Sequence, residues 1–488
     1  MYMNKTIEEL HELLVNGKLT SEELIKESLK KSHNIQEKYN AFVTILDDAK
    51  PTTVTDDLLS GIPYGIKDNY STKGILTTAS SNTLRDYVPF YTATAVENLS
   101  KHGAVAVNKT VLDEFGMGAT GTTGHTGPVL NPWNKNMMCA GSSAGSACAV
   151  AAGVYPYALG SDTGDSIRKP AAYCGIVGYK PTYGMISRYG LLPYASSLDT
   201  CGVLTRCVKD AAIVVDAMKG KDEHDMTSWD SSKMHLLNSI NGNVKGKKLC
   251  YIKELVSLNN YPHATDTLKA HLKNFMDALE KIKTTGIQIE EVSIDKKIVE
   301  SIASVYNVIS YAEATSNMSN LTGISFGPRE EGKNYVEMMK NYRTNNFSPL
   351  IKRRFIIGSY VLQAENKDRY FYNAQRLRRV ITNAWLELFK NYDGVILPVE
   401  AGPANYVDLS KNYNEFDHEL IPLHEHLQAA NLGGFPSITI PDGFVNNLPV
   451  GLNITSKPYG DEDMLNIASA IENVLGYANQ IAKEDTNE

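Results

Sequence analysis

AGSSAGSACAVAAG (140–153) and LGSDTGDSIRKP (159–170) are the two runs of small residues that set the character of this 488-residue chain, and a third run, GMGATGTTGHTGP (116–128), precedes them. Flexible linkers are also dense in Gly, Ser and Thr, but they are poor in apolar residues. Here runs of Ala and Val alternate with the Gly-Ser turns. This alternation favours a packed core whose loops bring the backbone close to a ligand.

Short apolar segments on both sides of these runs predict the strands of a sheet. GIPYGIKDN (61–69) is typical of a buried strand that ends in a turn, and TATAVENLSKHGAVAVNKT (92–110) predicts a helix followed by a strand. YDGVILP (392–398) and FPSITIP (435–441) predict two further buried strands. Because β-segments lie toward both ends of the chain with helices between them, we expect one α/β domain whose sheet is completed by the C-terminal third.

The rest of the sequence divides into a helical start, a polar insertion and a tail. Thr6 with Glu9, and Thr20 with Glu23, have capping-box spacing before apolar-periodic runs, so the first 50 residues are expected to be helical. We predict a single domain over 1–480, composed of the helical segment 1–50, a core at 61–215, a peripheral and mostly helical insertion at about 216–395, a sheet-completing part at 392–475 and, after the domain, a polar tail at 481–488.

Composition excludes several classes of protein. The net charge of −7 argues against a chain that grips nucleic acid on its own, although it leaves open a complex whose other subunits carry the basic surface. No apolar run is long enough to span a bilayer, and the N-terminus lacks the features of a signal or transit peptide. We therefore expect a soluble, cytoplasmic protein. The six cysteines form no C-x-x-C pair, which argues against a zinc or dithiol site and favours buried, reduced thiols.

Three polar residues in this framework are candidates for chemistry, and each also has a structural interpretation. Lys67 ends an apolar segment. It is either paired with Asp68 or solvent, or buried and able to act as a base. The second case requires its pKa to fall by roughly 3 units, which corresponds to about 4 kcal/mol of differential interaction between its two protonation states. Ser142 opens a run that suits a helix N-terminus, where serine is usually a cap; the run lacks the Gly-Lys-Ser/Thr ending of a phosphate loop. Ser166 lies in a turn-rich loop before Pro170, which is expected to stop any helix that follows. It is either a turn serine or a hydroxyl beside backbone donors suited to an anion.

The combination of these residues resembles the amidase signature family. The order Lys…Gly-Ser-Ser-x-Gly-Ser…Gly-Ser-Asp-Thr-Gly-x-Ser-Ile-Arg is typical of that family, as are the intervals of 75 residues from Lys67 to Ser142 and 24 from Ser142 to Ser166. The resemblance implies one large mixed β-sheet covered by helices on both faces. It also implies a Ser-Ser-Lys triad in which Lys67 is the base, Ser142 the bridging serine and Ser166 the nucleophile, with the backbone N–H groups of Thr163, Gly164, Asp165 and Ser166 as the oxyanion hole.

Further blocks, among them VGYKPTYGMISRYGLLPYASSLDTCG (177–202) and NLGGFPSITIPDGF (431–444), are similar to those of the family's glutaminase subunits in tRNA-dependent amidotransferases. The resemblance implies glutamine hydrolysis to supply ammonia, B and C partner subunits, and misacylated Glu-tRNA(Gln) or Asp-tRNA(Asn) as the acceptor. It implies no cofactor or metal in this chain, with ATP and Mg²⁺ used by the partner. Two alternatives remain: a free-standing amidase for small carboxamides, and a non-catalytic scaffold subunit.

The chain departs from the family pattern at two places. Asp165 stands where the family has a second glycine, and we expect its carboxylate to face away from the site, toward Arg168 or Lys169. By position Tyr306 and Arg354 resemble the residues that hold the substrate backbone. However, HEHLQAAN (424–431) stands where a family aspartate is expected, and His424 or Glu425 are the candidates to replace it. The HEH triplet lacks the H-E-x-x-H spacing of a metal site.

Overall fold

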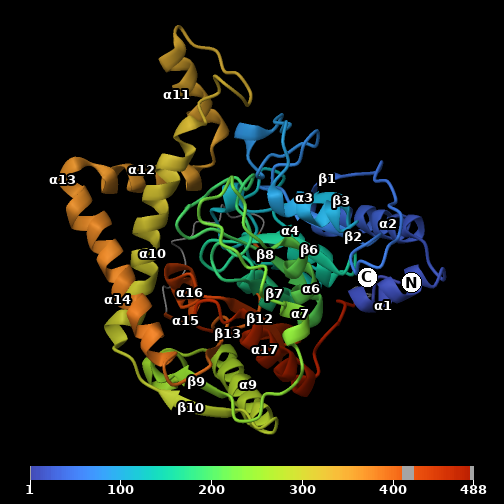
Figure 1. Cartoon of the computed structure of the whole chain (residues 1–488). Coiled ribbons are helices and arrows are strands. Elements are labelled where there is room, and N and C mark those ends of the chain that lie inside the picture. Colours follow the sequence, from blue (N-terminus) through green and yellow to red (C-terminus); the bar gives the residue numbers. More distant parts are fainter. Residues whose placement is uncertain (1, 409–421, 484–488) are drawn as a thin grey trace.

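A single mixed sheet of eleven strands runs through the computed structural model, which describes residues 2–408 and 422–483 (Figure 1). In sheet order the strands are β1 (Phe42–Ile45), β3 (Val105–Thr110), β2 (Pro63–Lys67), β6 (Tyr157–Asp162), β8 (Thr200–Thr205), β7 (Val177–Lys180), β12 (Ser437–Val445), β13 (Leu448–Thr455), β11 (Gly394–Pro398), β9 (Lys248–Ile252) and β10 (Gln288–Val292). The C-terminal strands β12, β13 and β11 continue the sheet that the first 205 residues begin, as the sequence predicts.

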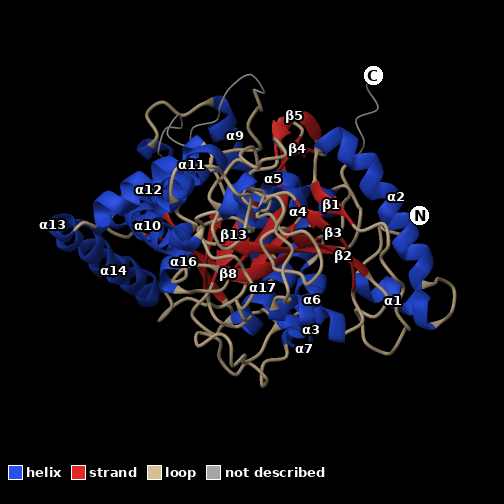
Figure 2. Ribbon diagram, turned by 90° about the horizontal axis from the view of Figure 1, so that it is seen from above, coloured by secondary structure: helices blue, strands red, loops and turns tan. Residues whose placement is uncertain are grey.

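Buried helices cover both faces of this sheet, as expected (Figure 2). Alternate residues of a strand point to opposite faces, and β6 shows this: Tyr157 and Leu159 join one core, and Ala158 joins the other. One face carries α2 (Ser21–Tyr39), α4 (Ala144–Ala151) and α5 (Arg168–Cys174); the other core holds α1 (Ile7–Val15), α3 (Thr94–Lys101), α6 (Val208–Met218), α7 (Leu236–Ser239), α9 (Asp266–Lys283) and α17 (Asp461–Leu475).

The central strands position the polar residues of interest at one edge. Strand β2 pairs in parallel with both β3 and β6, so the carboxyl ends of β2 and β6 lie side by side. Lys67 is the last residue of β2, and the loop that holds Ser166 follows β6 directly. The predicted strand at 61–69 and the predicted helix and strand at 92–110 are confirmed.

The polar insertion is mostly helical, but it also contains β9 and β10, which the sequence did not predict and which extend the sheet at its edge. Its long helices form an arm on one side of the sheet (yellow to orange in Figure 1). They are α10 (Lys296–Asn317), α11 (Tyr335–Asn346), α12 (Pro349–Leu362) and α14 (Asn373–Leu388), and the short helix α13 (Ala364–Lys367) lies between the last two in the sequence. The insertion also contains the short helix α8 (Lys253–Val256). Outside the insertion, the remaining short elements are α15 (Pro422–Glu425), α16 (Gln428–Gly433) and the hairpin of β4 (Leu130–Asn131) and β5 (Asn134–Met138).

The N-terminal segment confirms the predicted capping boxes but differs from the prediction in its secondary structure. Both capping boxes are present: the Thr6 and Thr20 hydroxyls accept hydrogen bonds from the N–H groups of Glu9 and Glu23, whose side chains bond back. However, the first 50 residues are not all helical, because β1 follows α2 and pairs with β3. The predicted tail at 481–488 lies mostly outside the described residues.

The prediction that Pro170 stops a helix is wrong, because α5 begins at Arg168 and contains Pro170. The N–H groups in the first turn of a helix have no partner within it, so proline is tolerated there. The consequence for the site is that Ser166 lies just before a helix N-terminus rather than in a long loop.

All six cysteines are free and buried, as expected. Within residues 2–408 and 422–483, no helix combines the length and the apolar character that a bilayer-spanning segment needs.

Helix α4 packs its first turn directly onto the backbone, and Gly145 permits this. A Cβ atom at Gly145 would lie 2.2 Å from the Ala41 carbonyl oxygen and 2.6 Å from the Val111 nitrogen. The Gly145 N–H group donates to the Val111 carbonyl at 2.9 Å. This contact fixes the helix that follows Ser142 and Ser143.

Gly145→Ala is therefore expected to destabilise the fold by about 1–3 kcal/mol, because backbone atoms cannot move aside as a flexible side chain can. Thermal unfolding followed by circular dichroism measures the loss. Gly402→Ala is the matched control, since its Cβ would meet only Thr267 Cγ2 at 3.3 Å. Equal melting temperatures for Gly145→Ala and wild type would contradict the close packing.

Candidate active site

Lys67 is fully buried, and its amine contacts oxygen atoms only. Its Nζ atom donates to the hydroxyls of Ser142 and Ser143, both at 2.8 Å, and to the Ser161 carbonyl at 3.1 Å. Burial lowers the pKa of Lys67 to about 7, even though four nearby aspartates, Asp162 foremost, act to raise it. A lysine with this pKa is neutral in a large fraction of molecules at neutral pH and can accept a proton.

The serine pair at the start of α4 faces this lysine instead of capping the helix. Ser143, not Ser142, occupies the N-cap position, and its side chain makes no capping hydrogen bond. Ser143 also donates its N–H to the Ser166 carbonyl at 3.1 Å, which joins the two small-residue loops. No role of its own is predicted for Ser143, although it stands next to Ser142 in the Gly-Ser-Ser motif.

Ser166 lies in the loop after β6, which we call the oxyanion loop (residues 163–166), and it lines a cavity of about 300 Å³. Its side chain is almost buried, with 4% of the residue exposed. In the described part of the chain, no hydrogen bond uses the N–H groups of Thr163, Gly164 or Ser166. These donors are therefore able to bind an oxygen atom of a molecule in the cavity.

A buried ion pair holds the oxyanion loop in shape. The Arg168 guanidinium bonds both carboxylate oxygens of Asp162, at 2.9 and 3.0 Å, and both side chains are fully buried. Arg168 also donates to the Gly164 carbonyl at 2.7 Å and to the Asn431 side chain at 2.7 Å. Burial acts to raise the pKa of Asp162, but Arg168, Lys180 and the Ile167 N–H group together hold the pKa below its usual value. The loop is thus fixed by the C-terminal segment that carries Asn431.

Arg354 and three tyrosines form one side of the cavity, and Tyr306 and Arg354 lie there as the sequence predicts. The Arg354 guanidinium donates to the Tyr194 hydroxyl at 2.7 Å and lies over the rings of Tyr194 and Tyr311, with 5.4 and 4.9 Å to the ring centroids. We call these three residues the arginine clamp. The Tyr306 ring covers Gly164, where a Cβ atom would lie 2.8 Å from the ring. Any larger residue at 164 would push Tyr306 away.

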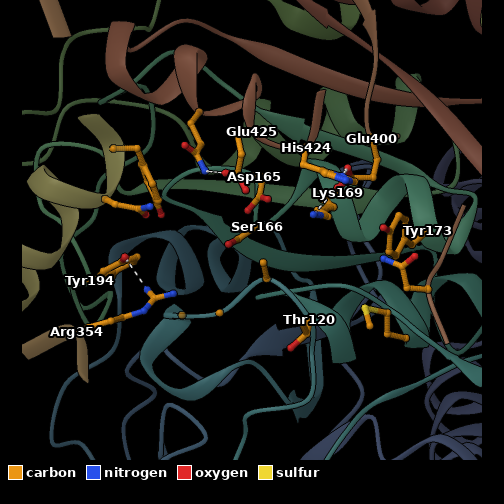
Figure 3. A pocket seen from close by; sticks show the side chains of 18 of the residues that line it. Thr120, Asp165, Ser166, Lys169, Tyr173, Tyr194, Arg354, Glu400, His424 and Glu425 are labelled. Carbon is orange, nitrogen blue, oxygen red and sulfur yellow. Dashed lines mark hydrogen bonds and ion pairs between the residues drawn. The ribbon is translucent and has the colours of Figure 1, made fainter. Parts of the chain in front are cut away.

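The other side of the cavity is acidic, and sequence reasoning identified only part of it. His424 and Glu425, the two candidates to replace the family aspartate, both line the cavity, and so do Lys169, Glu400 and Gln428. Glu400 contacts both Lys169 and His424, and Glu425 accepts a hydrogen bond from Gln428. In Figure 3, Arg354 and Tyr194 lie on one side of Ser166, and Asp165 and Glu425 lie on the other. The cavity therefore offers a cation on one side and carboxylates on the other.

The expectation that Asp165 faces away from the site, toward Arg168 or Lys169, is wrong for the cavity and for Arg168, whereas Lys169 lines the same cavity as Asp165. Asp165 lines the cavity next to Ser166, and its charge acts to raise the pKa of Lys67. The expected partner Arg168 is fully occupied by Asp162, Asn431 and backbone carbonyls, so it does not draw the Asp165 carboxylate out of the site.

This chain is similar to known proteins in sequence and in fold. The family model described as Amidase matches residues 23–465. Proteins named as the A subunit of glutamyl-tRNA(Gln) amidotransferase are 38% identical over 475 residues in Halothermothrix orenii (96% of this chain, 97% of that protein) and 38% identical over 489 residues in Streptococcus pneumoniae (98% of each).

Solved structures agree with these relatives. The crystal structure of the A subunit of glutamyl-tRNA(Gln) amidotransferase from Thermotoga maritima has a TM-score of 0.78 at 34% identity, covering 97% of this chain and 95% of that one. The native peptide amidase from Stenotrophomonas maltophilia, at 23% identity and a TM-score of 0.80, covers 99% of each chain and shares the fold.

The charge of Asp165 gives a pH test of the site. If Lys67 activates Ser166, the reaction of Ser166 with diisopropyl fluorophosphate, a reagent for activated serines, should slow as the pH falls below about 7, because Lys67 becomes protonated. Asp165→Asn removes a charge that stabilises the protonated lysine. The variant should therefore react about twofold to threefold faster than wild type at pH 6, once both rates are normalised to their values at high pH. Asp230→Asn, at an exposed position, is the control. A normalised rate of Asp165→Asn at pH 6 that is lower than that of wild type would show that Lys67 does not control the reaction.

Proposed function

The chain belongs to the amidase signature family, an enzyme family of amidases and amidotransferases, and we propose that it is the glutaminase subunit of a tRNA-dependent amidotransferase. The choice of subunit is supported by relatives at 38% identity that are named as the A subunit of the glutamyl-tRNA(Gln) enzyme. The single observation that carries the chemistry is the 2.8 Å bond between the buried Lys67 amine and the Ser142 hydroxyl, next to the cavity that Ser166 lines.

Proton transfer begins at Lys67. The neutral amine takes the proton of the Ser142 hydroxyl while Ser142 takes that of Ser166, and the Ser166 Oγ atom attacks the carboxamide carbon of glutamine. Lysine and serine keep their positions through this step because the amine is already bonded to the hydroxyl that it deprotonates. The alternative partner Ser143, at the same distance, holds the amine from a second direction.

The tetrahedral intermediate places a negative charge on the former carbonyl oxygen. The N–H groups of the oxyanion loop bind this oxygen, and they need no rearrangement because Arg168 already fixes the loop. The relay returns its proton to the leaving nitrogen, and ammonia departs. Water then attacks the glutamyl ester on Ser166 by the same route and releases glutamate.

The cavity walls orient a zwitterionic amino acid. Arg354 pairs with the α-carboxylate of glutamine, and Tyr306 closes over the bound molecule. Asp165 and Glu425, on the opposite side, attract the α-ammonium group (Figure 3). In this arrangement, the departure at Asp165 supplies a charge that the missing family aspartate would otherwise provide.

The ammonia serves a second reaction on another subunit. We propose that this chain works with B and C subunits in a heterotrimer. The B subunit uses ATP and Mg²⁺ to activate misacylated Glu-tRNA(Gln) or Asp-tRNA(Asn), and the ammonia converts it to Gln-tRNA(Gln) or Asn-tRNA(Asn). This chain itself holds no cofactor in the scheme.

One observation favours a second candidate, a free-standing amidase for small carboxamides. His424 and the Glu400–Lys169 pair line the cavity near the place where the family aspartate is expected, so the cavity differs in chemistry from the family pattern. The two candidates differ in their response to partners. A glutaminase subunit gains activity when B and C subunits bind, whereas a free-standing amidase does not.

The proposal predicts that Ser166→Ala, in a complex with B and C subunits, loses glutamine-dependent amidation of tRNA by at least about 1,000-fold. Amidation driven by added ammonium chloride should persist, because the second reaction does not use Ser166. Formation of aminoacyl-tRNA product from each nitrogen source is the measurement, with Ser232→Ala as a surface control. Glutamine-dependent amidation by Ser166→Ala at a near-normal rate would rule out Ser166 as the nucleophile. Loss of both activities in the assembled variant would argue against separate sites.

A further inference from the structure

Asp199 is a buried carboxylate that accepts its hydrogen bonds from neutral groups. It lies directly before β8, and 3% of it is exposed. Its Oδ1 atom accepts a hydrogen bond from the Thr163 hydroxyl at 2.6 Å, and its Oδ2 atom accepts from the N–H groups of Tyr194 and Ala195 at 2.9 and 3.0 Å. In the described residues, no lysine, arginine or histidine nitrogen lies within ion-pair distance of it. Burial raises the pKa of Asp199 to about 6, whereas the Thr163 hydroxyl, the two backbone N–H groups and the more distant charge of Arg188 act to lower it.

The groups that bind Asp199 belong to two different parts of the site. Thr163 begins the oxyanion loop, and its hydroxyl is bonded to Asp199. Tyr194 belongs to the arginine clamp, and its ring hydroxyl accepts the hydrogen bond from Arg354 at 2.7 Å. One carboxylate therefore joins the donors next to Ser166 to the residue that places Arg354.

We propose that Asp199 is a positioning residue that fixes the distance between the oxyanion loop and the arginine clamp, so that a single substrate reaches both. The inference rests on the proposed function, since it assigns the two ends of the substrate to these two parts. Asp199 is not among the residues that line the cavity; it acts on the two parts through Thr163 and Tyr194, and its charge also acts to raise the pKa of Lys67. A group 1 Å out of place can cost about 100-fold in rate, so a rigid link between the two ends affects catalysis directly.

The Thr163 arm of the link is tested with two substitutions. Thr163→Val keeps the shape but removes the hydroxyl, so kcat for glutamine hydrolysis should fall by about 10-fold to 100-fold with little change in KM. The reaction of Ser166 with diisopropyl fluorophosphate should slow in parallel, because that reagent uses the oxyanion loop but not the clamp. Thr163→Ser restores the hydroxyl and should recover most of the lost rate. The same kcat in Thr163→Val and wild type would overturn the inference.

The Tyr194 arm should show the opposite pattern. Tyr194→Phe keeps the backbone N–H bond to Asp199 but removes the acceptor for Arg354. Its KM for glutamine should rise by about tenfold, while kcat falls by less than about threefold.

Asp199→Asn combines the two effects if Asp199 links the two parts. It should lower kcat as Thr163→Val does and raise KM as Tyr194→Phe does. The double variant Thr163→Val/Asp199→Asn should then have a kcat within about threefold of that of Asp199→Asn, because both changes break the same hydrogen bond between Thr163 and Asp199. A folded Asp199→Asn with lower stability but kcat and KM within twofold of wild type would show a purely structural role and overturn the inference.

If Asp199→Asn does not fold, the Thr163 and Tyr194 variants decide the question alone. Wild-type chain that, in a complex with B and C subunits, neither hydrolyses glutamine nor reacts with diisopropyl fluorophosphate any faster than Ser166→Ala would overturn the proposed function, and this inference with it. Active wild type with an unaffected Thr163→Val would overturn the inference alone.

Discussion

The site depends on the burial of one amine among neutral oxygens. Lys67 is fully buried, and among the described residues no carboxylate lies within ion-pair distance of it; two serine hydroxyls and a carbonyl surround it instead. The neighbouring strand offers a contrast, because the equally buried Lys109 lies 3.2 Å from the Asp68 carboxylate. A contacting carboxylate favours the charged lysine, whereas neutral oxygens in a buried place allow the proton to leave. The difference between these two lysines is what permits base chemistry at 67.

The oxygens around Lys67 come from segments that the fold must bring together. The Ser161 carbonyl belongs to the next-to-last residue of β6, and the two serines precede α4, whose first turn lies on the backbone at Ala41 and Val111. The oxyanion loop in turn is held by Arg168, which bonds the Asn431 side chain of the C-terminal part. The insertion between these parts supplies Tyr306 and Arg354. The residues that line the cavity thus come from different stretches of sequence, and the fold brings them together.

Much of this was predictable from the sequence, and the failures have physical reasons. The strand that ends at Lys67 and the helix after Ser143 are local patterns of apolar and small residues. The five-residue strand β9 lies in a polar region, and it pairs with β10 and β11, so only tertiary pairing reveals it. That Arg168 does not pair with Asp165 was unpredictable, because Arg168 binds Asp162 and the Asn431 side chain, which lies about 260 residues away in the sequence. The acidic wall of the cavity likewise joins Glu400 to Lys169 across the chain.

The central claim is that Lys67 and Ser142 form one proton relay, and a double-mutant cycle tests it most directly. Lys67→Ala and Ser142→Ala, alone and combined, would be compared by the glutaminase kcat of the assembled complex. Each single change should cost at least about 100-fold, and the double variant should be within about threefold of the worse single variant, because a relay that lacks one member is already broken. Losses that multiply in the double variant would show two independent contributions and contradict the relay.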